Sequence, residues 1–90
     1  MFNIRKTDFF NRKAKKIFRK QPKLLGNFQK VISKLIENPF EQSLKTHKLS
    51  GEFQDFYACS LNYEFRIIFL FEIKDDEIIL TNIGTHDEVY

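Results

Sequence analysis

The chain has 90 residues, of which 42% are hydrophobic and 11 are Phe, and this length and composition fit one domain, residues 1–90, with one compact core. Its single cysteine, Cys59, excludes an internal disulfide, and no paired Cys or His spacing indicates a metal site, so we expect a cytoplasmic protein without metal or cofactor. The longest apolar run, residues 67–71, is far shorter than the roughly 18 residues of a membrane span.

The charge is divided unevenly along the chain. Residues 1–38 contain 11 Lys or Arg against Asp8 and Glu37, a net charge of +9, so the remainder must carry −6 to give the overall +3. Clustered cations release condensed counterions when they neutralise phosphates, so the first part of the chain favours a polyanionic partner. The alternative is that these Lys and Arg residues only form the solvated face of an ordinary helix.

Two helices are predicted after a short strand at residues 2–5. Thr7-Asp8 is typical of a helix start, and Gln21-Pro22 interrupts the helical pattern before Asn38-Pro39 ends it. Apolar residues at helical spacing form one stripe on each helix. The stripes are Phe10, Ala14, Ile17 and Phe18 on the first helix, and Leu24 or Leu25, Phe28, Ile32, Leu35 and Ile36 on the second.

From residue 39 the pattern changes to the alternation typical of strands. Strands are predicted at residues 53–61, 64–73 and 77–83, after an irregular or extended segment at 44–49. In the middle strand, alternation places Arg66 on the face opposite Phe65, Ile67, Phe69, Phe71 and Ile73. The order β-α-α-β-β-β predicts an α+β domain in which two N-terminal helices pack on a small antiparallel sheet.

Three segments in this order resemble the RelE/ParE superfamily of bacterial toxins, and in particular its YafQ-like members. The segments are the turn His47-x-Leu49-x-Gly51, the strand Tyr63-Glu64-Phe65-Arg66-Ile67-Ile68-Phe69 and the terminus Gly84-Thr85-His86-Asp87-Glu88-Val89-Tyr90. The resemblance covers essentially the whole chain. It implies a RelE-like fold and a type II toxin that cuts mRNA on the ribosome and is held silent by a cognate antitoxin.

Metal-free RNA cleavage needs a base for the 2′-hydroxyl proton, a cation for the phosphorane and an acid for the leaving 5′-oxygen. The resemblance places His86 and His47 in the active site, where imidazole exchanges protons near neutral pH. Arg66 suits the phosphorane, because a guanidinium grips two phosphate oxygens and keeps its charge. A structural ion pair of Arg66 with Glu64 or Glu72 is the alternative. The base could be His47, Glu64 or His86.

The remaining candidates are expected to bind RNA. Tyr90 matches an aromatic of the family that can stack on a base, although it is the last residue and chain ends fray. Lys48 could add charge to the site. The basic first helix is expected to contact ribosomal RNA. Its candidate residues are Lys13, Lys16, Arg19 and Lys20.

Two other functions remain open. Ser60 lies where the closest relatives carry a histidine, and serine cannot transfer a proton near neutral pH, so a non-catalytic member that binds RNA or a protein partner is one alternative. ParE-like members keep the fold but poison DNA gyrase without cutting nucleic acid, and the His-bearing terminus argues against that reading. Phe65 replaces a larger aromatic, and its position in the strand predicts core packing.

Overall fold

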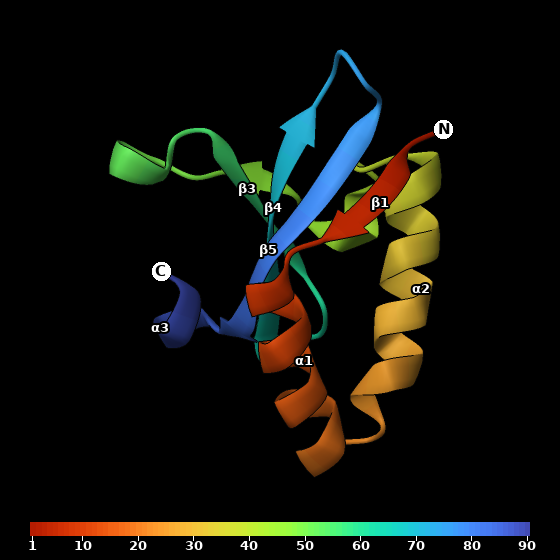
Figure 1. Cartoon of the computed structure of the whole chain (residues 1–90), viewed down its shortest axis with the longest axis vertical. Coiled ribbons are helices and arrows are strands. Elements are labelled where there is room, and N and C mark those ends of the chain that lie inside the picture. Colours follow the sequence, from red (N-terminus) through yellow and green to blue (C-terminus); the bar gives the residue numbers. More distant parts are fainter.

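The structure, a computed structural model, describes residues 1–90 except for the side chain of Phe53. A five-stranded sheet in the order β1-β5-β4-β3-β2 forms its centre, and α1 and α2 pack on one face of it (Figure 1). The helices are α1 (Asp8–Lys20), α2 (Leu24–Glu37) and the short α3 (His86–Val89). The strands are β1 (Asn3–Lys6), β2 (His47–Lys48), β3 (Phe56–Ser60), β4 (Phe65–Glu72) and β5 (Glu77–Thr85).

The predicted fold class is confirmed: two N-terminal helices pack on a small sheet in an α+β domain. Strands β2 to β5 are antiparallel to their neighbours, whereas β1 runs parallel to β5, with Ile4 opposite Ile78, so the sheet is mixed. The irregular segment contains the single-turn helix η1 (Gln42–Leu44) and β2, and the single-turn helix η2 (Gly51–Phe53) precedes β3.

The helix boundaries follow the sequence signals. The Thr7 hydroxyl accepts a hydrogen bond from the Phe10 amide at 3.1 Å, which caps the first turn of α1. Residues 21–23 separate the two helices at the predicted break before Pro22. In α2, Leu24 is buried while Leu25 is 46% exposed, which settles the alternative between them.

The hydrophobic core lies between the two helices and the sheet. Its strand residues come from alternate positions of β4, as predicted for Phe65, Ile67 and Phe69, and Phe71 packs against them. Ile73 was expected on the same face, but it is 76% exposed because β4 ends at Glu72 and Ile73 belongs to the turn that follows. Helix α2 adds Val31, which the predicted stripe omitted.

A β-bulge in β5 changes which of its residues face the core. Ile68 pairs with Asn82 and the next residue of β4 pairs with Leu80, so Thr81 is the additional residue on β5. Strict alternation from Leu80 would turn Ile83 away from the core, yet both are fully buried in the same cluster. The bulge therefore also decides which side chains of β5 reach the opposite face of the sheet.

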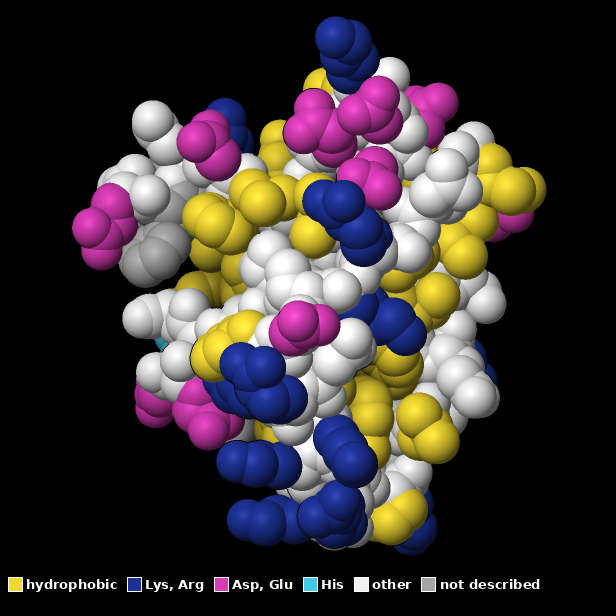
Figure 2. Space-filling model, viewed as in Figure 1, with side chains coloured by type: hydrophobic (Ala, Val, Ile, Leu, Met, Phe, Trp, Pro, Cys, Tyr) yellow, Lys and Arg dark blue, Asp and Glu magenta, His cyan; other side chains and the backbone are white. Residues whose placement is uncertain are grey.

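None of the helices in the described part of the chain combines the length and apolar character that a bilayer-spanning segment needs. Figure 2 shows that Lys and Arg side chains gather over α1 at one end of the molecule, while Asp and Glu gather at the other end around the β4–β5 turn. The charge asymmetry of the sequence is therefore also an asymmetry in space.

Candidate active site

The face of the sheet opposite the core carries the predicted site residues from the strands. Residues paired across neighbouring strands place their side chains on the same face. Arg66 pairs with Ser60 on β3 and with Gly84 on β5, and His47 pairs with Ala58 one row away. Strand pairing thus brings together His47 and Arg66, which are 19 positions apart in the sequence.

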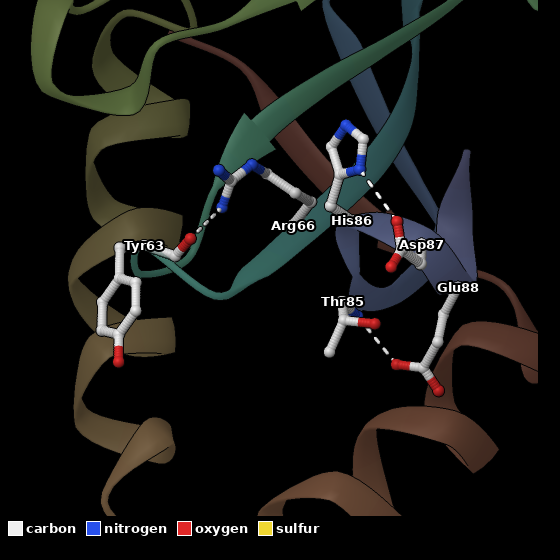
Figure 3. A network of polar contacts seen from close by, with 6 residues as sticks. All are labelled: Tyr63, Arg66, Thr85, His86, Asp87 and Glu88. Atoms are coloured by element: carbon white, nitrogen blue, oxygen red, sulfur yellow. Dashed lines mark hydrogen bonds and ion pairs between the residues drawn. The ribbon is translucent and has the colours of Figure 1, made fainter.

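The C-terminus forms the short helix α3, which packs against β5 and β4. Thr85 caps the helix, and its amide donates to Glu88 Oε1 at 2.8 Å in a capping box (Figure 3). The hydrogen bonds from Thr85 hold the pKa of the Glu88 carboxyl below its ordinary value, because they favour the charged form. The Thr-x-x-Glu spacing at residues 85–88 is a sequence signal for this helix, which the predicted elements did not include.

Gly84 allows α3 to approach the sheet. A Cβ atom on Gly84 would lie 3.1 Å from the Cβ atom of Glu88 and 3.2 Å from Cγ1 of Val89. Any larger residue must therefore push α3 away. Gly84 was not among the predicted site residues, because its role as a positioning residue depends on how closely α3 packs on the sheet.

Helix α3 brings Tyr90 and His86 to His47. The Tyr90 hydroxyl lies 3.3 Å from His47 Nε2, and the ring of His86 meets the ring of Tyr90 edge to face at 4.4 Å. The three side chains share a hollow of about 410 Å³, which we call the histidine hollow. Its lining residues are His47, Lys48, Leu49, Ser50, His86, Val89 and Tyr90.

The contacts of His47 indicate which ring nitrogen carries the hydrogen when the ring is neutral. Nδ1 lies 3.1 Å from the carbonyl oxygen of Lys45, which can only accept, so Nδ1 carries the hydrogen. Nε2 then presents a lone pair, which accepts from the Tyr90 hydroxyl. Burial raises the pKa of Tyr90, and the nearby charge of Arg66 offsets part of this effect, so the phenol keeps its proton at neutral pH. In the neutral ring, Nε2 is therefore the nitrogen that faces the hollow with a lone pair.

His86 has a different environment. Its Nδ1 lies 3.4 Å from Asp87 Oδ1, and both side chains are exposed (Figure 3). Both histidines contact Tyr90, His47 at its hydroxyl and His86 at the edge or face of its ring.

Arg66 lies beside the histidine hollow but does not line it. Its Nη1 donates to the carbonyl oxygens of Asn62 at 2.9 Å, Tyr63 at 3.2 Å and Phe65 at 3.1 Å. Figure 3 shows the guanidinium directed toward Tyr63 and away from His86. Within the described residues these bonds all use Nη1, which leaves the edge formed by Nε and Nη2 for another ligand.

The predicted alternative for Arg66, an ion pair with Glu64 or Glu72, is absent from the described part of the chain, where its partners are backbone carbonyls. Glu64 precedes β4 in a bend that Asn62 closes by accepting from its amide at 2.9 Å. Its side chain is exposed and is not among the residues that line the histidine hollow. Glu72 lies at the far end of β4.

The predicted RNA-binding lysines and arginines fall into two groups. Lys16, Arg19 and Lys20 are exposed on α1, and Lys48 lines the histidine hollow. Lys13 is half-buried and donates to Asn82 Oδ1 at 2.8 Å, so it ties α1 to β5. It is also near Glu88, whose pKa it helps to lower. Lys13 therefore contributes to the structure around α3.

Two other polar side chains, those of Cys59 and Ser60, lie outside the histidine hollow. Burial raises the pKa of the Cys59 thiol to about 12, so it stays protonated inside the core. Ser60, the residue that replaces a family histidine, pairs with Arg66 and is outside the histidine hollow. Among the described residues, no group of three or more His, Cys, Asp or Glu side chains could hold a metal ion.

Comparisons with known proteins extend over the whole chain. The family model described as "Bacterial toxin of type II toxin-antitoxin system, YafQ" matches residues 2–90. The metal-bound toxin from Helicobacter pylori is 26% identical over 100% of both chains, with a TM-score of 0.80. None of the curated proteins matches the chain.

Two solved structures from E. coli share the fold at lower identity. YafQ from strain BL21(DE3) is 17% identical with a TM-score of 0.81, covering 100% of this chain and 99% of that chain. A chain of the DinJ-YafQ complex is 17% identical with a TM-score of 0.79 and the same coverage.

Proposed function

Because the chain belongs to the YafQ family of toxins from bacterial type II toxin-antitoxin systems, we propose that it is an endoribonuclease that cleaves mRNA on the ribosome by metal-free acid–base chemistry. The observation that supports this most strongly is the placement of two imidazoles around one phenol, with His47 Nε2 at 3.3 Å from the Tyr90 hydroxyl and the His86 ring at 4.4 Å from the Tyr90 ring.

In the proposed reaction His47 is the general base. The ribose 2′-hydroxyl takes the place of the Tyr90 hydroxyl at Nε2 and transfers its proton there. The 2′-oxygen attacks the adjacent phosphorus and forms a new P–O bond. The P–O5′ bond breaks, and protonated His86 supplies the proton that the leaving 5′-oxygen needs. The products are a 2′,3′-cyclic phosphate and a 5′-hydroxyl, so atoms and charge balance.

Arg66 is proposed to stabilise the phosphorane from the side of the hollow. The Nε and Nη2 edge can donate two parallel hydrogen bonds to phosphate oxygens while Nη1 stays bound to the loop carbonyls. Its charge already acts at this site, because it influences the pKa of Tyr90. Preorganised donors of this kind contribute about 3 to 4 kcal/mol each to transition-state stabilisation.

The proposed partner that silences the toxin is a cognate antitoxin. A similar chain, YafQ from E. coli, has been solved in a complex with DinJ. The net charge of +9 over residues 1–38, from 11 Lys or Arg against Asp8 and Glu37, favours an acidic partner segment. The exposed Lys and Arg side chains of α1 gather on one end of the molecule, where ribosomal RNA is the other polyanion that we propose they contact (Figure 2).

The test incubates purified protein with translating ribosomes and a defined mRNA, and maps the ends of the products. We expect 2′,3′-cyclic phosphate and 5′-hydroxyl ends at positions within the reading frame. A 3′-hydroxyl and 5′-phosphate would contradict the mechanism, because direct attack by water produces them.

A parallel incubation with gyrase and supercoiled plasmid tests the ParE-like alternative. Cleavage complexes there with intact mRNA would replace the nuclease proposal by a gyrase poison. A folded protein inactive in both assays, and harmless on expression, would favour a non-catalytic member.

A further inference from the structure

A second hollow of about 450 Å³ lies on the other side of Arg66, between α2 and the loop that joins β3 to β4. Four cationic side chains line it, and we call it the lysine hollow: Lys30, Lys34, Lys45 and Arg66. Of the described residues that line it, none is acidic. Neither the core nor the proposed chemistry of the histidines uses this space.

The positive charge of the lysine hollow is largely unpaired. Within the described residues the ion pairs join Arg5 to Glu77 and His86 to Asp87, so none involves the four cations. The Lys34 charge helps to lower the pKa of the Glu41 carboxyl, which accepts hydrogen bonds from the amide of Ser43 at 2.9 Å and from its hydroxyl. The Lys34 ammonium donates to the same hydroxyl at 2.7 Å. A concave surface with this charge concentrates anions.

Tyr63 stands at the rim of the lysine hollow with its side chain in solvent. It is 93% exposed, although a ring of this size is usually at least half-buried. Its backbone is held, because its carbonyl accepts from Arg66 and the Asn62 side chain closes the loop. Figure 3 shows the ring projecting from this loop away from Arg66. A fixed backbone with a free aromatic ring is suited to stack on an unpaired base.

We propose that the lysine hollow binds a nucleotide of the substrate RNA that flanks the scissile linkage, with its phosphate among Lys30, Lys34 and Lys45 and its base on Tyr63. The inference rests on the proposed nuclease function and extends it. Arg66 lies between the two hollows, so the RNA backbone passes from the histidines across the guanidinium into the lysine hollow. This site sets how firmly the toxin holds RNA and does not take part in proton transfer.

Binding is measured in a His86→Ala background, so that RNA stays intact, by anisotropy of a short fluorescent single-stranded RNA. We expect Tyr63→Ala to weaken binding about 5- to 150-fold through loss of stacking. Tyr63→Phe keeps the ring and should bind normally. For K30A/K34A we expect the slope of log K against log salt to fall by about 1.4, since each lost phosphate contact removes about 0.7.

The matched control is K23A/K74A, which removes the same charge from exposed sites outside the hollow and should leave the slope nearly unchanged. Equal losses in the two double variants would overturn the proposal, because binding would then depend on net charge alone. The proposal would also be overturned if K30A/K34A lost affinity for the antitoxin but bound RNA normally, because the hollow would then be a protein-binding site. Thermal midpoints check that every variant is folded.

The two proposals fail in different ways. If the wild-type protein cleaves mRNA on ribosomes and the hollow variants bind and cleave as it does, the lysine hollow is not an RNA site and the nuclease stands. If the wild-type protein cleaves nothing while Tyr63→Ala and K30A/K34A lose RNA affinity, the hollow binds RNA and the nuclease proposal fails.

Discussion

The two faces of the sheet have opposite characters. On the face under α1 and α2, Ile67, Phe69 and Leu80 are fully buried. On the other face, His47 is exposed and the His86 side chain is 66% exposed. The core residues come from β4 and β5, whereas His47 lies on β2 and His86 on α3, which packs against β4 and β5. Side chains that stabilise the fold and side chains proposed to react are therefore separable by mutation.

The largest expected effect comes from the covered face. Phe69→Ala should cost about 3 to 5 kcal/mol in the free energy of unfolding, because it leaves a cavity in the centre of the core. That is a large share of the roughly 5 to 15 kcal/mol that stabilises a domain. Urea titration measures the change. The control is Phe9→Ala, at a site that is 51% exposed, and it should lower the free energy of unfolding far less. Equal losses in the two variants would contradict the separation of a stabilising face from a reactive face.

On the open face, His47→Ala and His86→Ala should each reduce the rate of mRNA cleavage about 10²- to 10⁴-fold through loss of acid or base. The thermal midpoint should stay close to that of the wild type, because both rings are exposed and their contacts are few. Single-turnover cleavage on ribosomes gives the rates, and calorimetry gives the midpoints. A histidine variant that unfolds at a much lower temperature would show a structural role instead.

Arg66 is the residue for which we expect a role in both stability and activity. Arg66→Ala removes the proposed phosphate ligand and also the donor that three backbone carbonyls share, so both activity and stability should fall. We expect the stability loss to be about 1.5 to 3 kcal/mol, as for hydrogen bonds from a charged group. Calorimetry of the Arg66→Ala and Arg66→Lys variants measures it. An unchanged midpoint for Arg66→Ala would mean that the carbonyl contacts do not stabilise the loop.

A substitution at Gly84 tests whether cleavage depends on the exact position of α3. Gly84→Ala should displace α3 by a few tenths of an ångström and reduce cleavage about tenfold, because small misplacements of reacting groups are costly. Gly26→Ala is the matched control: nothing lies within 4 Å of its added Cβ atom. It should stabilise α2 by about 0.5 to 1 kcal/mol and leave cleavage unchanged. Equal activity of the two variants would contradict the role assigned to Gly84.

The sequence predicted the elements well where the signals were local. Thr7 and Pro22 marked helix boundaries, and alternation placed Phe65, Ile67 and Phe69 in the core and Arg66 opposite them. It gave no account of the bulge at residue 81 or of the parallel pairing of β1. The C-terminus was expected to be a chain end without regular structure, whereas the structure forms a short helix there with a capping box.

Sequence alone determined the composition of the site and its family, because residue types, their order and the local periodicities are written in the chain. Tertiary structure decided the geometry: His47, His86 and Tyr90 meet in one hollow, while Arg66 turns toward the loop after β3 and lines another. Distances across a sheet depend on strand register, on a bulge and on the close approach of α3 over Gly84. The contact of Gly84 with Glu88 is local in the sequence, and the Thr-x-x-Glu spacing beside it signals α3. Strand register and the bulge instead join residues far apart in the chain, so no short window of sequence contains both partners.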